Sequence, residues 1–134
     1  MIDVLYVGCF EHRDDEVQID EHVHRGHPAV KRPLGWHVVE DCLQHAAIGI
    51  HWEAGTPRLP EKWLLSYEHG YLTFDRSELT ADAIGVIRRL VEQHGCEIVY
   101  PQTARFLTVD EVEEYSRRLA RRRRLPWGTE FENS

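Results

Sequence analysis

The segment KWLLSYEHGYLTFDR, residues 62–76, predicts a β-hairpin, and this hairpin decides the fold class of the chain. Its centre, His69-Gly70, suits a two-residue turn, because glycine and, less readily, histidine tolerate a positive φ angle. One register places most of the large side chains of both strands on a single face. The expected opposite pairs in that register are Glu68 with Tyr71, Tyr67 with Leu72, Leu65 with Phe74, and Trp63 with Arg76.

Outward from the hairpin, residues 2–10 (IDVLYVGCF) are apolar on both alternating faces after Asp3, which predicts a central strand covered on both sides. Thr80 and Gly95 suit the two ends of a helix, and Thr108 with Glu111 forms a capping box. The other expected elements are a helix over 36–46, a strand over 47–53, a loop over 55–61, a helix over 81–94, strands over 96–100 and 104–107, and a last helix after residue 108.

These elements predict one α+β domain over residues 1–124, followed by an irregular tail over 125–134. We expect a sandwich of about three helices on a mixed or mostly antiparallel sheet of about five or six strands. The chain has 134 residues, of which 42% are hydrophobic and 29% are charged, and this composition is typical of one globular domain.

The sequence predicts a cytoplasmic protein that does not interact with a membrane. No run approaches the roughly 18 apolar residues of a membrane-spanning helix, and the first residues lack the features of a signal peptide. The three cysteines are widely spaced and form no CxxC pair, so we expect reduced, buried thiols at Cys9, Cys42 and Cys96.

Charge is distributed unevenly along the chain, whose formal net charge is -7. Residues 11–34, called here the acidic segment, are polar, lack an apolar period and predict a long loop, whereas arginines accumulate over 117–124. Such poles favour contacts with a charged partner or with a second copy of the chain through its tail. The expected contact residues are Asp14, Asp15, Glu16, Asp20, Glu21, Arg121, Arg122, Arg123, Arg124 and Trp127.

The acidic segment also contains a candidate metal site. His22 and His24 project from the same side of an extended chain, where they, His27 and a nearby carboxylate could bind zinc or another divalent transition metal. No later motif completes such a site, so we favour a solvated polar loop whose histidines titrate near neutral pH.

A second candidate metal or acid-base site lies in the helix expected over 36–46. His37, Asp41 and His45 are spaced four residues apart and therefore share one helix face. The same spacing is equally typical of a solvated helix face, and both interpretations stay open.

Two classes of function fit the sequence. The first is a binding protein without catalysis, such as a bacterial or phage inhibitor, antitoxin or immunity protein, whose acidic segment covers a basic surface of another protein. The alternative is a small metal-dependent hydrolase with these histidines as ligands and Glu53 or Asp41 as base. RNA binding through Arg117–Arg124 is a weaker alternative, because the net charge is negative and these arginines also suit the helix dipole. We favour the binding protein and assign no catalytic residue, because this function requires the fewest distant residues to converge.

Overall fold

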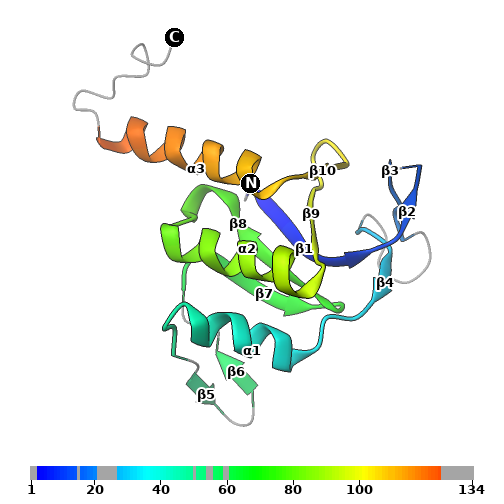
Figure 1. Cartoon of the computed structure of the whole chain (residues 1–134), viewed down its shortest axis with the longest axis horizontal. Coiled ribbons are helices and arrows are strands. Elements are labelled where there is room, and N and C mark those ends of the chain that lie inside the picture. The colour runs from blue at the N-terminus through cyan, green and yellow to red at the C-terminus, as the bar shows by residue number, and fades with distance from the viewer. Residues whose placement is uncertain are drawn as a thin grey trace.

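A computed structural model of the chain describes residues 3–14, 16–20, 27–49, 51–53, 56–58 and 61–124. Within these residues the fold is α+β, as predicted, with three α-helices beside an antiparallel sheet of six strands (Figure 1). The helices are α1 (Trp36–His45), α2 (Ala81–His94) and α3 (Val109–Arg124). The sheet contains β1 (Val4–Phe10), β4 (Val30–Arg32), β7 (Leu64–Glu68), β8 (Tyr71–Asp75), β9 (Glu97–Tyr100) and β10 (Arg105–Leu107). The described residues also form two small hairpins and one 3₁₀ turn. One hairpin pairs β2 (His12–Arg13) with β3 (Glu16–Val17), and the other pairs β5 (His51–Glu53) with β6 (Thr56–Arg58). The 3₁₀ turn is η1 (Arg76–Glu78).

Strand β1 lies at the centre of the sheet, which confirms the expectation from its apolar sequence. It pairs with β8 on one side and with β9 on the other, and its last two residues also pair with β4. The order across the sheet is β10-β9-β1-β8-β7. The last four residues of β1 are all buried, because both faces of the sheet are covered.

The β7–β8 hairpin has the predicted turn. His69 and Gly70 both adopt positive φ angles, of 61° and 86°, which bring the two strands together with a right-handed twist. The pairs next to this turn are the predicted ones, Glu68 with Tyr71 and Tyr67 with Leu72.

Farther from the turn the predicted register is wrong. A bulge in β7 places Leu64, rather than Leu65, opposite Phe74. The Trp63 carbonyl accepts its hydrogen bond from the Asp75 N–H at 2.8 Å, so the pairing expected for Trp63 shifts as well. A bulge adds one residue to one strand and reverses the alternation beyond it, which leaves Leu65 38% exposed.

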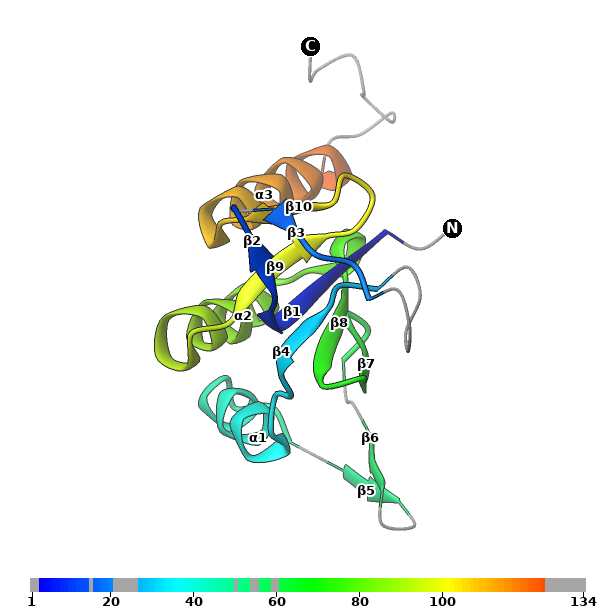
Figure 2. The same cartoon turned by 90° about the vertical axis from the view of Figure 1, so that its right-hand side faces the viewer.

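All three helices lie on one face of the sheet (Figure 2). Between them and the strands is the main hydrophobic core, and we call this side the helix-covered face. Each fully buried aliphatic side chain in it contributes about 1.5–3 kcal/mol to folding. Its fully buried members include Leu5, Val7, Leu72, Phe74, Val39, Leu43, Ile87 and Leu90.

The opposite face carries a smaller core of Phe10, Tyr71 and Val99. Side chains of the acidic segment, Val17 and Val30, pack against this cluster, so we call this side the segment-covered face. The segment was predicted to be one long loop, but its described parts contain β2, β3, β4 and an isolated bridge between residues 19 and 28.

The ends of α2 and α3 follow the predicted capping pattern. The Ala83 N–H donates to the Thr80 hydroxyl at 3.3 Å, and Gly95 ends α2 with a φ angle of 67°. Before α3, the Glu111 N–H donates to the Thr108 hydroxyl at 3.1 Å, and the Thr108 N–H donates to the Glu111 carboxylate at 3.0 Å. Both capping predictions are therefore confirmed.

Two predictions around α1 and β5 need correction. Instead of starting a strand, Ala47 adopts a positive φ angle of 57° in a turn after α1, and the strand begins only at His51. The expected loop over 55–61 contains β6, which pairs with β5 away from the main sheet. None of the helices in the described ranges has the length and hydropathy needed to cross a membrane.

Candidate functional site

A pocket of about 650 Å³ opens where the β10 edge of the sheet meets the ends of α2 and α3 and the β2–β3 hairpin. Its lining comes from both faces of the sheet and is mainly apolar. The lining residues are Val91, Cys96, Ile98, Phe106, Leu107, Val109, Ala104, Thr108, His12, Glu16, Glu97 and Arg105. Pockets of this size and polarity are the usual places where proteins bind small molecules or a partner's side chain.

A histidine and a carboxylate meet in the wall of this pocket. Glu97 on β9 accepts a hydrogen bond from the Phe10 N–H at 3.1 Å, and its other oxygen contacts Nε2 of His12. The His12 ring also stacks on Phe106, with the ring centroids 4.4 Å apart and the planes 6° apart. These contacts attach the β2–β3 hairpin to the edge of the sheet.

The thiol that lines the pocket is not activated as a nucleophile. Burial, and then the neighbouring Cys9, raise the pKa of the Cys96 thiol to about 12, so the thiol that lines the pocket stays protonated and is a poor nucleophile. The predicted burial of Cys9, Cys42 and Cys96 is confirmed, with exposed fractions of 6%, 1% and 3%. All three are free thiols.

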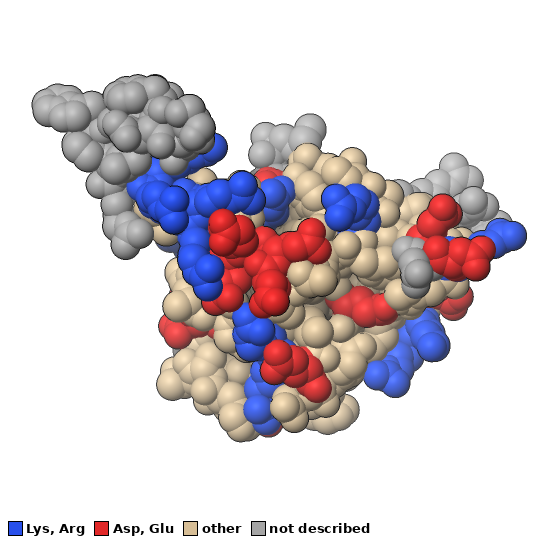
Figure 3. All heavy atoms as spheres, turned by 45° about the horizontal axis from the view of Figure 1, so that its top comes forward, with Lys and Arg blue, Asp and Glu red and all other residues tan. Residues whose placement is uncertain are grey.

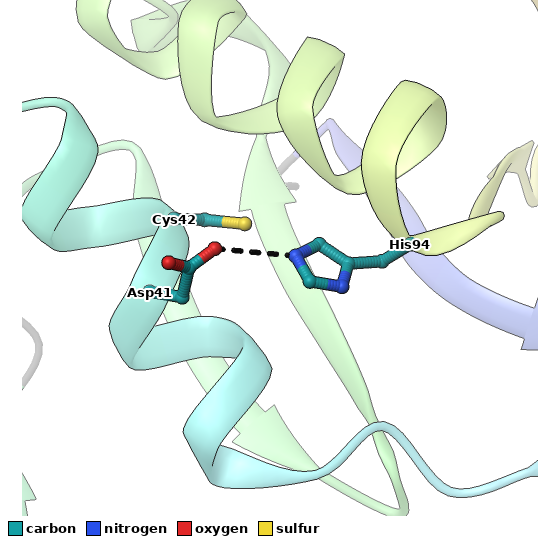
Figure 4. A group of neighbouring side chains, drawn as sticks. All are labelled: Asp41, Cys42 and His94. Atoms are coloured by element: carbon teal, nitrogen blue, oxygen red, sulfur yellow. Dashed lines mark hydrogen bonds and ion pairs between the residues drawn. The ribbon is translucent and has the colours of Figure 1, made fainter.

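A second group of polar side chains lies where α1 packs against α2 (Figure 4). The Asp41 carboxylate accepts hydrogen bonds from Arg89 at 3.1 Å and from Nε2 of His94 at 3.3 Å. The hydrogen bond from Arg89 is the largest cause that lowers the pKa of Asp41; partial burial opposes it, and His94 and His45 add to the lowering. Asp41 is therefore a carboxylate at neutral pH.

Cys42 is the neighbour of Asp41 on α1, and its sulfur points into the same space between the two helices (Figure 4). Burial raises the pKa of this thiol to about 11, and the negative charge of Asp41 adds to the rise. One ligand atom from each of Asp41, Cys42 and His94 lies within 4.8 Å of the other two.

The structure brings together part of the histidine ladder predicted on α1. Nδ1 of His45 lies 3.3 Å from the Asp41 carboxylate. His37 is exposed and lies over Gly35 at the start of the helix, outside the group that Asp41 forms. The ladder therefore omits Cys42 and His94, which complete the group, and includes His37, which does not join it.

The metal site predicted in the acidic segment is only partly described. His22 and His24 lie outside the described residues, whereas His27 lies between aromatic rings on the segment-covered face. It contacts the Tyr71 hydroxyl through Nδ1 and stacks on Tyr6 with a centroid distance of 5.5 Å. His27 therefore takes part in packing this face.

Two of the acids predicted to contact a partner, Asp14 and Glu16, are exposed on the β2–β3 hairpin. Asp20 is half-buried beside the chain at His27, to which its backbone N–H donates at 2.8 Å. Figure 3 shows acidic side chains on the side of the molecule where Figure 1 places this hairpin. The predicted contact residues Asp15, Glu21 and Trp127 lie outside the described residues, as do the side chains of Glu53, Arg123 and Arg124.

Arginines of α3 lie next to acids of the same helix (Figure 3). Arg117 pairs with Glu113 at 3.3 Å and with Glu114 at 3.6 Å, and Arg118 lies 3.8 Å from Glu114. Arg121 and Arg122 are exposed on the last turns. These pairs reduce the positive charge that this helix offers to a nucleic acid.

Sequence reasoning did not single out Glu97, Arg89 or His94. Their partners are distant in the chain: His12 and Glu97 are 85 residues apart, and Asp41 and His94 are 53 residues apart. The sequence offered only local signals for these residues: Glu97 is a carboxylate in a short apolar strand, and His94 is a histidine in the last turn of a helix. Comparison with protein-family models, curated protein sequences and solved structures finds no match to the chain.

Proposed function

We propose that this protein is a binding protein without catalysis that recognises a basic surface of another protein, as inhibitors, antitoxins and immunity proteins do. The observation that carries the proposal is the position of the acidic β2–β3 hairpin at the rim of an apolar pocket, to which it contributes His12 and Glu16. The proposal includes a reducing, cytoplasmic setting, since the three cysteines are free.

The two parts of this surface have complementary roles in binding. An apolar pocket of about 650 Å³ can bury a large side chain of the partner, and such buried anchors supply most of the affinity of protein interfaces. The exposed acids Glu11, Asp14 and Glu16 beside it favour a cationic partner and accelerate the encounter. The partner is therefore a protein segment with lysine or arginine flanking one bulky apolar side chain.

The contacts of His12 support a binding role over acid-base catalysis. Its ring lies against Phe106 and contacts the Glu97 carboxylate, whose other oxygen is held by the backbone. The histidine thus positions the hairpin beside the pocket.

A set of synthetic peptides tests the proposal with the full chain. The probe is a twelve-residue peptide of alternating arginine and serine with one central tryptophan, compared with the same peptide carrying alanine in place of tryptophan. We expect micromolar binding of the tryptophan peptide in low salt, weaker binding as salt increases, and a loss of about tenfold with alanine. Isothermal titration calorimetry measures these affinities.

Two triple variants distinguish the effect of the hairpin's acids on binding from the effect of the overall negative charge. The triple change Glu11→Gln, Asp14→Asn and Glu16→Gln is expected to weaken binding roughly tenfold in low salt, because each rim charge contributes up to about 1 kcal/mol. The control removes the same charge elsewhere, through Glu61→Gln, Asp82→Asn and Glu92→Gln, and should leave affinity within about twofold. Equal losses in the two triple variants, or equal binding of both peptides, would overturn the proposal.

A further inference from the structure

The group at the α1–α2 contact has the composition of a transition-metal site. Asp41 and Cys42 are consecutive residues of α1, and His94 is the last residue of α2. Figure 4 shows the three side chains pointing toward one another across the space between the helices. Among the residues that the structure describes, these three have ligand atoms within 4.8 Å of each other, and they supply one oxygen, one sulfur and one nitrogen.

Zinc is the ion that best suits this donor set. Zn²⁺ binds carboxylate oxygen and imidazole nitrogen at about 2.0–2.2 Å and thiolate sulfur at about 2.3 Å, in a tetrahedron whose ligand atoms are roughly 3.3–3.8 Å apart. Nε2 of His94 already lies 3.3 Å from the Asp41 carboxylate. The separations among the three ligand atoms are at most 4.8 Å, so the longest has to shorten by about 1 Å to fit a zinc tetrahedron. Small side-chain rotations can supply this change.

Neighbouring residues can orient the ligands without occupying the site. Arg89 donates to Oδ2 of Asp41 at 3.1 Å, the same oxygen that lies 3.3 Å from Nε2 of His94. Each carboxylate oxygen has two lone pairs, so Oδ2 can bind the ion with one and keep its hydrogen bond from Arg89 with the other. Outer hydrogen bonds of this kind fix the direction of metal ligands in known sites.

The group is partly exposed to solvent. The side chains of Asp41 and His94 are 37% and 26% exposed, whereas Cys42 is 1% exposed at the bottom of the group. An ion can enter from the solvent side and keep a water molecule at the position that no side chain fills.

We propose that Asp41, Cys42 and His94 bind one Zn²⁺ ion, with water as the fourth ligand and with release of the Cys42 thiol proton to solvent on binding. The ion links the middle of α1 to the end of α2 and stabilises the folded state, because the ligands come together only when the two helices pack. None of the three ligands lines the pocket, and the existence of the site does not depend on the proposed binding function.

Cobalt is the best first probe, because Co²⁺ bound to a thiolate has a charge-transfer band in the near ultraviolet that histidine and carboxylate ligands do not produce. We expect this band to saturate at one equivalent of Co²⁺ added to metal-free full-length protein, and we expect Zn²⁺ to abolish it by displacement. Because only a thiolate ligand produces this band, its appearance would exclude a site made only of histidines elsewhere in the chain.

Variants assign the ligands. Cys42→Ser should remove the band, and His94→Gln should weaken Zn²⁺ binding by about a hundredfold or more, since even outer partners contribute about 10- to 100-fold. The controls are Cys96→Ser, another buried thiol, and His37→Gln, a histidine on α1 itself that lies outside the group, and both should bind as the unchanged protein does. Circular dichroism of each metal-free variant checks folding.

Two results would overturn the proposal. One is the absence of the thiolate band in folded, reduced protein saturated with Co²⁺. The other is a Zn²⁺ affinity of folded His94→Gln equal to that of the His37→Gln control.

Discussion

The two faces of the main sheet are covered in different ways. The helix-covered face packs against three amphipathic helices and contains most of the buried aliphatic side chains. The segment-covered face has a core of only Phe10, Tyr71 and Val99, over which a polar, acid-rich segment lies with Val17, Val30 and His27 turned inward. The helix-covered face therefore supplies most of the stability. The segment-covered face buries fewer apolar side chains, and the segment over it carries exposed acids close to the pocket.

The largest expected effect concerns the helix-covered face. Leu90 on α2 is fully buried, and Leu90→Ala should lower the free energy of unfolding by about 2–5 kcal/mol, because it removes apolar contacts and leaves a cavity. Urea denaturation followed by circular dichroism measures the change. A loss below about 1 kcal/mol would mean that α2 contributes less to the core than its burial indicates.

A steric change tests the tightness of the segment-covered face. A Cβ atom on Gly8 would lie 2.7 Å from Cβ of Tyr71 and 3.3 Å from the Phe10 ring. Gly8→Ala should therefore cost about 1–3 kcal/mol in urea denaturation. The control, Gly85→Ala, adds its methyl group in open space on α2 and should stabilise the protein by about 0.5–1 kcal/mol. If Gly8→Ala is tolerated as well as this control, the segment-covered face is loosely packed.

Alkaline pH probes the same face through Tyr71. Burial raises the pKa of Tyr71 above its ordinary value of 10.0. Above that value the unfolded chain loses the phenol proton while the folded protein keeps it, so stability present at neutral pH is lost as the pH rises. The expected loss is at most about 1.4 kcal/mol per pH unit for this group.

The variant Tyr71→Phe separates this contribution from those of other tyrosines. Tyr6, Tyr67 and Tyr100 also have raised pKa values, so the variant should retain part of the alkaline decrease and lose part of it. At neutral pH it should cost about 1 kcal/mol, because the contact with His27 disappears. An unchanged slope of unfolding free energy against pH would contradict the burial of this phenol.

The smallest effect is expected at the bulge in β7. Leu65 is 38% exposed, so Leu65→Ala should change the unfolding free energy by less than about 0.5 kcal/mol, whereas Leu64→Ala should cost about 2–5 kcal/mol. Thermal and urea denaturation of the two variants compare the neighbours directly. A larger loss from Leu65→Ala than from Leu64→Ala would instead support the regular register that the sequence predicts.

The elements with local causes were predictable. The helix ends at Thr80, Gly95 and Thr108 follow from hydrogen bonds made within three or four residues, and the turn at His69-Gly70 follows from backbone preferences. The coverage of the second face was harder to predict, because the acidic segment has no apolar period and contributes only scattered apolar or aromatic contacts to that face.

The sequence by itself determined the α+β class, the central position of β1, the helix caps and the burial of the cysteines, since each depends on composition or on neighbours along the chain. Only the tertiary structure decided which polar side chains meet. His12 reaches Glu97 across 85 residues, and Asp41 reaches His94 across 53 residues, through the pairing of strands and the packing of α1 on α2. A single bulged residue was enough to exchange Leu65 for Leu64 in the core, because side chains alternate between faces at every residue of a strand.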